Sequence, residues 1–122
     1  MPSMDERPPI WVGHVAIVVS DPARSADWWE EIGLRSVHRG HDISILELRG
    51  GTHLLLFPGE PKTGPAPFDC MVDDVDGTHA SFAAKNFAPA DIVRGEIHDQ
   101  FTVEDPDGYV VQFSNSHVEG PV

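Results

Sequence analysis

Short stretches in which apolar and polar residues alternate with period two cover much of the chain, and two stretches with helical spacing lie between them. Trp11–Val19 is rich in β-branched residues and is predicted to form the first strand. Ser20-Asp21-Pro22 is typical of a helix start, and Gly33 of a helix end. The first half of the chain is completed by three short strands, which are expected at residues 34–38, 43–48 and 52–57.

The second half repeats this order after a proline-rich connector at residues 58–67. A strand is expected over Phe68–Val72, and Asp74-Val75-Asp76 is typical of the start of a second helix. A weak strand at Asp91–Val93 and a hairpin over Phe101–Ser114 complete the set. The connector cannot be a helix or a central strand, because its prolines lack a backbone N–H group.

An internal duplication is the most economical interpretation, because an offset of 53 residues aligns the two sets of elements and places Trp29 on Phe82. With 122 residues the chain has the length of one domain, which we place at residues 11–116. It is expected to follow a flexible arm at residues 1–10 and to precede a tail at 117–122. The parts of the domain are module one (11–57), a linker (58–67) and module two (68–116).

The amino-acid composition indicates which partners the protein is not expected to bind and in which compartment it is expected. Twenty acidic and eight basic residues give a formal net charge of −12, which repels nucleic acid and anionic membranes. No apolar run approaches ~20 residues, so neither a transmembrane span nor a signal peptide is expected. A single cysteine, Cys70, excludes an internal disulfide and suits a reducing compartment. We therefore expect a cytoplasmic protein that binds neither nucleic acid nor membrane.

The hairpin carries the clearest local motif, Asp105-Pro106-Asp107-Gly108, with Pro and Gly at positions that a type I turn favours. Together with four earlier segments, this motif resembles the vicinal oxygen chelate superfamily, also called the glyoxalase/bleomycin-resistance/dioxygenase fold. The resemblance covers about residues 11–115. The earlier segments are His14–Val19, Ser25 with Trp28-Trp29, Gly33-Leu34, and Val72-Asp73-Asp74-Val75-Asp76.

The resemblance implies an α+β fold of two βαβββ modules, in which curved mixed sheets form an open cup and the helices lie on the convex side. It also implies a homodimer. Metal-using members of the superfamily carry four ligands in the cup, one each from the first and last strands of each module. The corresponding positions here are His14, Leu55, Pro67 and Gln112.

Of these four positions, only His14 carries a good metal ligand, and Gln112 offers only its amide oxygen. The side chains of Leu55 and Pro67 cannot bind a metal. The resemblance therefore implies that the usual metal site is not preserved. This argues against ordinary glyoxalase, extradiol-dioxygenase or epimerase activity.

Alternation along the strands places further polar side chains on the face that would line the cup. His53 shares that face with Leu55, and Asp69 is an acid in an apolar strand. A buried carboxylate without a partner is unfavourable, so we expect Asp69 to meet His14 or His53. Two histidines and a carboxylate can bind Fe, Mn, Ni or Zn, and they can equally form a metal-free, hydrogen-bonded patch in a ligand pocket. The sequence leaves both interpretations open.

The candidate site residues fall into three overlapping sets. Candidate catalytic residues are His53, Asp69 and His98, since an aspartate can orient a histidine that acts as a general base. Candidate metal ligands are His14, His53, Asp69 and Gln112. Candidate ligand-binding residues are His14, His53, Leu55, Asp69, Met71, His98, Asp99 and Gln112.

Three functions remain as hypotheses. The leading one is a protein that binds a small organic molecule in the cup, with neither the usual metal quartet nor another cofactor. The first alternative is a metal-dependent lyase, isomerase or dioxygenase with a divalent metal in a rearranged His14/His53/Asp69 site. The second alternative is a non-catalytic structural module whose cup is filled by its own side chains.

Overall fold

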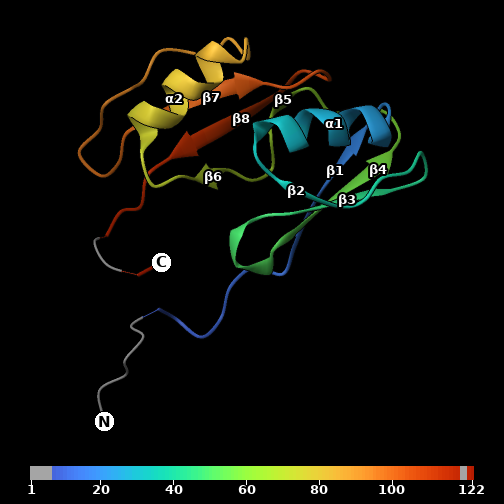
Figure 1. Ribbon diagram of the computed structural model, residues 1–122, viewed down its shortest axis with the longest axis horizontal. Coiled ribbons are helices and arrows are strands. Elements are labelled where there is room, and N and C mark those ends of the chain that lie inside the picture. The colour runs from blue at the N-terminus through green and yellow to red at the C-terminus, as the bar shows by residue number, and fades with distance from the viewer. Residues whose placement is uncertain (1–6, 119–120) are drawn as a thin grey trace.

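The computed structural model describes residues 7–118 and 121–122 (Figure 1). Residues 1–6 of the expected arm and residues 119–120 of the expected tail lie outside the described residues. Two βαβββ modules lie side by side, and both helices lie on the same side of the sheets (Figure 1). The elements of module one are β1 (His14–Val19), α1 (Pro22–Ile32), β2 (Arg35–His38), β3 (Ser44–Glu47), the 3-10 turn η1 (Arg49–Gly51) and β4 (His53–Pro58).

Module two follows the same plan, except that an isolated bridge between Val93 and Gln100 replaces the first strand after the helix. Its first strand is divided into two short pieces, and its helix has 10 residues against 11 in α1. The elements are β5 (Gly64–Pro65), β6 (Cys70–Met71), α2 (Val75–Ala84), β7 (Gln100–Glu104) and β8 (Tyr109–Ser114). Within the described ranges, neither helix is long and apolar enough to cross a membrane.

Each module has its own four-stranded mixed sheet. In module one the strand order is β1-β4-β3-β2, with β1 and β4 parallel and the other pairs antiparallel. In module two β8 is central: β5 and β6 pair with it in parallel along one edge, and β7 pairs with it antiparallel along the other. The α+β fold of two βαβββ units is therefore confirmed, with two separate sheets that are not closed.

The ends of the helices follow from local side-chain chemistry. Asp21 accepts a hydrogen bond from the Ala23 amide at 3.1 Å and caps α1. Gly33 ends α1 with φ 141°, and its amide donates to the Trp29 carbonyl at 3.1 Å. Asp74 caps α2 by accepting from the Gly77 amide at 3.0 Å. Both predicted helix starts and the predicted end of α1 are confirmed.

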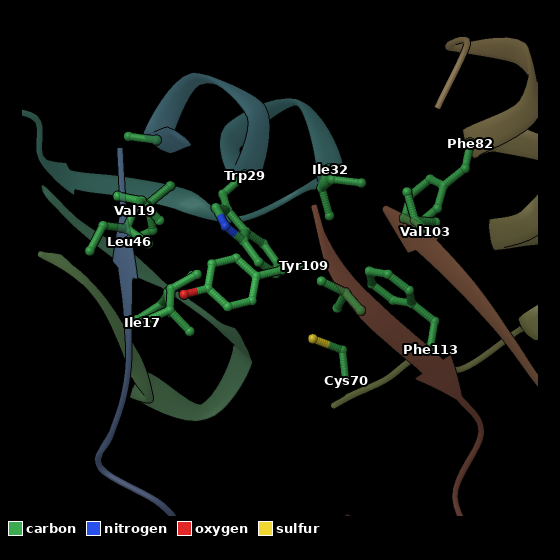
Figure 2. Packing of buried hydrophobic residues seen from close by; sticks show 14 of the residues in the cluster. Ile17, Val19, Trp29, Ile32, Leu46, Cys70, Phe82, Val103, Tyr109 and Phe113 are labelled. Atoms are coloured by element: carbon green, nitrogen blue, oxygen red, sulfur yellow. The ribbon is translucent and has the colours of Figure 1, made fainter. Parts of the chain in front are cut away.

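One hydrophobic cluster continues across both modules (Figure 2). Trp29 of α1 is fully buried, and its ring centroid lies 5.9 Å from that of Phe68 in module two. The Tyr109 hydroxyl points towards β1 (Figure 2) and donates to the Val18 carbonyl at 2.6 Å. The two modules therefore share a core and are not independent folding units.

The predicted turn at residues 105–108 joins the modules at a second point. Its i to i+3 bond is formed, since the Gly108 amide donates to the Asp105 carbonyl at 3.1 Å. The Asp107 carboxylate accepts hydrogen bonds from the Ser20 amide at 3.1 Å and the Ser20 hydroxyl at 2.6 Å. Arg24 adds an ion pair to Asp107 at 3.4 Å. The hairpin turn of module two is thereby anchored to the start of α1.

Two strands predicted in module two are shorter in the structure or reduced to a bridge. The strand expected over Phe68–Val72 is reduced to β6, because it follows a bend at residues 67–68 at the end of the proline-rich connector. The connector itself contributes β5, at the edge of the sheet, where proline is tolerated. The weak strand expected at Asp91–Val93 is only an isolated bridge between Val93 and Gln100.

Candidate functional site

Four polar side chains form a row across the sheet of module one. His14 of β1 pairs with His53 of β4, His53 pairs with Glu47 of β3, and Glu47 pairs with Arg35 of β2. Directly paired residues point to the same face of a sheet. The neighbouring Leu54 is fully buried on the helix side, so this cross-strand row lies on the opposite, open face.

Hydrogen bonds and an ion pair connect three members of the cross-strand row. The His53 Nε2 atom lies 3.1 Å from Glu47 Oε1, and Arg35 pairs with the other oxygen of the same carboxylate. The rings of His14 and His53 are tilted by 45°, with centroids 5.8 Å apart. The side chain of Glu47 is only 20% exposed, whereas that of Arg35 is 78% exposed. Glu47 is therefore held between two partners and fixes the orientation of the His53 ring.

This arrangement suits either polar recognition or proton transfer. A histidine held by a carboxylate keeps one ring nitrogen towards that carboxylate and leaves the other available to a ligand. The same geometry is that of an oriented general base. Arg35 balances the charge of Glu47, and His14 provides a second imidazole at the same level of the sheet.

A recess of about 450 Å³ adjoins the Arg35 end of the cross-strand row. It extends from β2 to η1 and includes both Arg35 and Glu47 among its walls. Gly50 and Gly51, with φ 87° and 91°, form its far end. These two left-handed residues also make the tight connection that places Glu47 opposite His53.

Asp69 is not brought into this site. It lies outside β6, one residue before it, and is exposed. In the described part of the chain, no hydrogen bond or ion pair involves its carboxylate. The expected meeting of Asp69 with His14 or His53 was therefore wrong, because the bend at residues 67–68 ends the strand that was to orient this side chain. Gln112 lies in the other sheet, half-buried and paired with Thr102.

His98 and Asp99 take part in other contacts. The His98 ring is stacked on that of His117, with centroids 4.8 Å apart and planes 10° from parallel. Asp99 forms an ion pair with Arg94 at 2.9 Å, and Arg94 also binds Asp76 at the start of α2. Arg94 thus fastens the loop before β7 to α2, and Asp99 holds the Arg94 side chain. Within the described residues, the three candidate catalytic residues form no hydrogen bonds with one another: these are His53, Asp69 and His98.

Comparison with known proteins identifies the family. A sequence model of the Glyoxalase/Bleomycin resistance protein/Dioxygenase superfamily matches residues 11–113. The chain belongs to this superfamily. No curated protein matches the chain.

Several solved structures have the same fold as this chain. A lactoylglutathione lyase from Agrobacterium tumefaciens has a TM-score of 0.76 and 20% identity over 94% of this chain and 100% of that chain. A glyoxalase-related enzyme from Clostridium phytofermentans has a TM-score of 0.74 and 19% identity over 92% and 99%. TioX from Micromonospora sp. ML1 has a TM-score of 0.69 and 22% identity over 88% and 99%. At these identities the likeness shows a common fold.

The residues present do not fit the metal that the superfamily commonly uses. Across residues 7–118 and 121–122, no three His, Cys, Asp or Glu side chains are grouped so that they could hold a metal ion. The ligand positions implied by the resemblance include Leu55 and Pro67, which offer no donor atom. The alternative ligand set of His14, His53 and Asp69 is not assembled. We therefore derive no chemical step through a metal.

Sequence reasoning missed Glu47 and Arg35, which complete the cross-strand row. Alternation over residues 43–48 places Ile45 and Glu47 on one face of the strand, so the face of Glu47 can be predicted from the sequence. Its partner across the strands depends on the register between β3 and β4, which the short turn with Gly50 and Gly51 sets. Leu55, by contrast, was correctly placed on the face that carries His53.

Proposed function

We propose that this superfamily member binds a small organic molecule on the open face of its first sheet, without a metal. The observation that carries the proposal is the cross-strand row of His14, His53, Glu47 and Arg35. Small-molecule sites combine apolar surface with a few oriented polar groups. Ala16, Leu55 and Phe57 lie on the same face as the cross-strand row and supply apolar surface, with Phe57 39% exposed.

The charge arrangement also supports binding over a purely structural role. A structural ion pair needs only Arg35 and Glu47, yet the carboxylate also holds His53, and His14 is exposed beside it. An imidazole with one nitrogen occupied and one free can donate to or accept from a ligand, depending on its tautomer. Both histidines therefore offer ligand contacts that the stability of the fold does not require.

A second function, metal-independent proton transfer on the bound molecule, is favoured by one specific observation. The 3.1 Å contact between His53 Nε2 and Glu47 Oε1 is the contact that orients a general base. In this proposal Glu47 takes the positioning role that the sequence suggested for Asp69. The acid–base group itself is His53.

The proposal is tested with tag-free protein and a library of small organic molecules, using ligand-observed NMR. We expect molecules whose binding is lost in His53→Leu and Glu47→Gln but is retained in Glu96→Gln, an exposed acid in the loop before β7. Metal content should stay below about a tenth of an equivalent after addition and removal of Fe(II), Mn, Ni or Zn. Ligands that bind both variants as tightly as the wild type would contradict the proposed site.

We further propose that the protein is a homodimer. β1 forms an edge of its sheet, and three consecutive apolar residues before it, Ile10, Trp11 and Val12, are 83%, 67% and 59% exposed. Exposed edge strands and contiguous apolar side chains are typical of interaction surfaces. Light scattering should give about twice the chain mass of 13.4 kDa, and Trp11→Ser should shift the population towards monomer.

A further inference from the structure

A second recess, of about 490 Å³, lies at the seam between the modules. One wall is formed by the end of α1 and the end of β3, and the other by β6 and α2. We call it the seam cleft and define it by Ile32, Leu48, Cys70, Phe82, Lys85 and Phe113. It adjoins the recess beside Arg35 but is lined mainly by residues that the cross-strand row does not use.

The floor of the seam cleft is apolar. Ile32, Cys70, Phe82 and Phe113 are between 3% and 7% exposed, and they come from both modules (Figure 2). The rings of Phe82 and Phe113 meet edge to face, with centroids 5.1 Å apart. Burial raises the pKa of the Cys70 thiol to about 12, so this group stays neutral and contributes apolar surface rather than a nucleophile.

The rim carries polar groups from one side of α2. Asp74, Thr78, Ser81 and Lys85 are spaced so that they lie along one helix face, and all four line the seam cleft. Asp74 is engaged as the cap of α2 by the Gly77 amide. The hydroxyls of Thr78 and Ser81 and the ammonium of Lys85 are the donors that this face presents to the cleft.

Two basic residues line the seam cleft, Arg49 and Lys85, and of these only Arg49 has a partner of opposite charge among the described residues. Arg49 is bound by Asp73 at 2.9 Å, and Glu47 is bound by Arg35. The Lys85 ammonium lies 3.4 Å from the Glu31 carbonyl oxygen, but no ion pair of the described residues includes it. In a chain with 20 acidic and eight basic residues, this leaves one available positive charge beside an apolar floor.

We propose that the seam cleft is a second binding site, for a small organic monocarboxylate with an aromatic body. The carboxylate binds the Lys85 ammonium and the Ser81 hydroxyl, and the ring packs against Phe82 and Phe113. The volume lies in the range of small-molecule sites, about 300–1,000 Å³. The net charge of −12 disfavours ligands with several negative charges, so the ligand carries a single carboxylate.

This site goes beyond the proposed function, since its ligand contacts come from α2 and β8, and of the cross-strand row only Glu47 lines the seam cleft. The test is a ¹H–¹⁵N NMR titration of the full chain with 3-phenylpropionate and with its neutral amide, 3-phenylpropionamide. We expect saturable shifts at Thr78, Ser81, Lys85 and Leu48 with the acid. The amide should bind roughly tenfold more weakly, because it cannot form the charge-assisted hydrogen bond.

Substitutions of the exposed Lys85 test binding at the seam cleft without disturbing the fold, and His53→Leu tests whether the acid binds at the cross-strand row. Lys85→Gln should weaken the acid about tenfold, whereas Lys85→Arg, Lys62→Gln and His53→Leu should leave its affinity unchanged. The inference is overturned if the acid gives no saturable shifts at α2, if the amide binds as well as the acid, or if Lys85→Gln has no effect. Loss of binding in His53→Leu would instead assign the acid to the cross-strand row and overturn the seam site.

Discussion

Module one and module two repeat one sequence of elements but present different chemistry on their open faces. In module one, β1 pairs with β4 over six consecutive positions, and the open face carries the cross-strand row. In module two, the first strand is divided into β5 and β6, each of two residues. Its open face carries Thr102 and Gln112 as a direct pair, with the exposed Glu104 beside them on β7. The row of polar side chains joined by a hydrogen bond and an ion pair thus lies in the module whose first strand is continuous.

The physical reason for this difference is register. A side chain is held at a fixed level of a sheet only where backbone pairing continues through its position. His14 and His53 satisfy this condition, whereas Asp69 follows a bend and lies outside the strand. In module two only β7 and β8 pair over several consecutive positions, whereas in module one the first strand is also held in register along its whole length.

The largest expected effect concerns the core that the two modules share. Trp29 and Phe82, equivalent in the duplication, are 0% and 4% exposed. Replacing either by Ala should lower the free energy of unfolding by ~3–5 kcal/mol, because a large buried side chain leaves a cavity. Chemical denaturation of both variants should show a single transition. Two transitions in either variant would mean that the modules unfold independently.

The next largest loss of stability is expected when the contact of Asp107 with Ser20 and Arg24, which anchors the turn of module two to α1, is removed. Asp107→Ala removes two hydrogen bonds from Ser20 and the ion pair with Arg24. We expect a loss of ~1–3 kcal/mol in the free energy of unfolding, because the Asp107 side chain is only 7% exposed. Asp42→Ala, at an exposed acid in the loop before β3, serves as the control and should change little. Equal effects of the two substitutions would contradict the role of the anchor.

The same turn should make the stability of the whole protein depend on pH. Burial raises the pKa of the Asp105 carboxyl, although its oxygen accepts hydrogen bonds from the Tyr109 and Asp107 amides. A carboxyl with a raised pKa in the folded state is ionised more readily in the unfolded chain. The folded state therefore loses stability as the pH rises through that range, and none of this penalty is present at lower pH.

Asp105→Asn should accordingly gain stability relative to the wild type over the pH range above about 4, the ordinary pKa of an aspartate. The measurement is chemical denaturation of both proteins across this pH range. Asp42→Asn provides a matched carboxyl without burial, and its difference from the wild type should stay flat. A flat difference for Asp105→Asn as well would contradict the raised pKa.

The smallest stability effects are expected at the candidate carboxylates of the open faces. Glu47→Gln should cost no more than ~1 kcal/mol, because its partner Arg35 is largely exposed. Asp69→Asn should change stability by less than ~0.5 kcal/mol, since this side chain is exposed and forms no hydrogen bond or ion pair with the described residues. The two variants should differ in function: Glu47→Gln should abolish ligand binding, and Asp69→Asn should leave it intact. Loss of ligand binding in Asp69→Asn would instead support the site of His14, His53 and Asp69 that the sequence suggested.

The sequence predicts most of the fold and only part of the site. Caps such as Asp21 and Gly33, and the turn at residues 105–108, are local signals, so the elements they bound were placed correctly. Alternation also gave the correct face for His53. Partners across strands are not local: they depend on register, which the positive φ angles of Gly50 and Gly51 help to set between β3 and β4. For that reason the sequence suggested Asp69, and not Glu47, as the carboxylate that contacts His53.

The central claim is that the cross-strand row of module one binds a small organic molecule without a metal. Its most direct test is a ¹H–¹⁵N NMR titration of tag-free protein with a ligand from the library screen, before and after treatment with EDTA. The account predicts shifts on β1, β3 and β4, centred on His14, Glu47 and His53, that EDTA leaves unchanged. Shifts that require an added divalent metal, or that fall on β7 and β8, would contradict it.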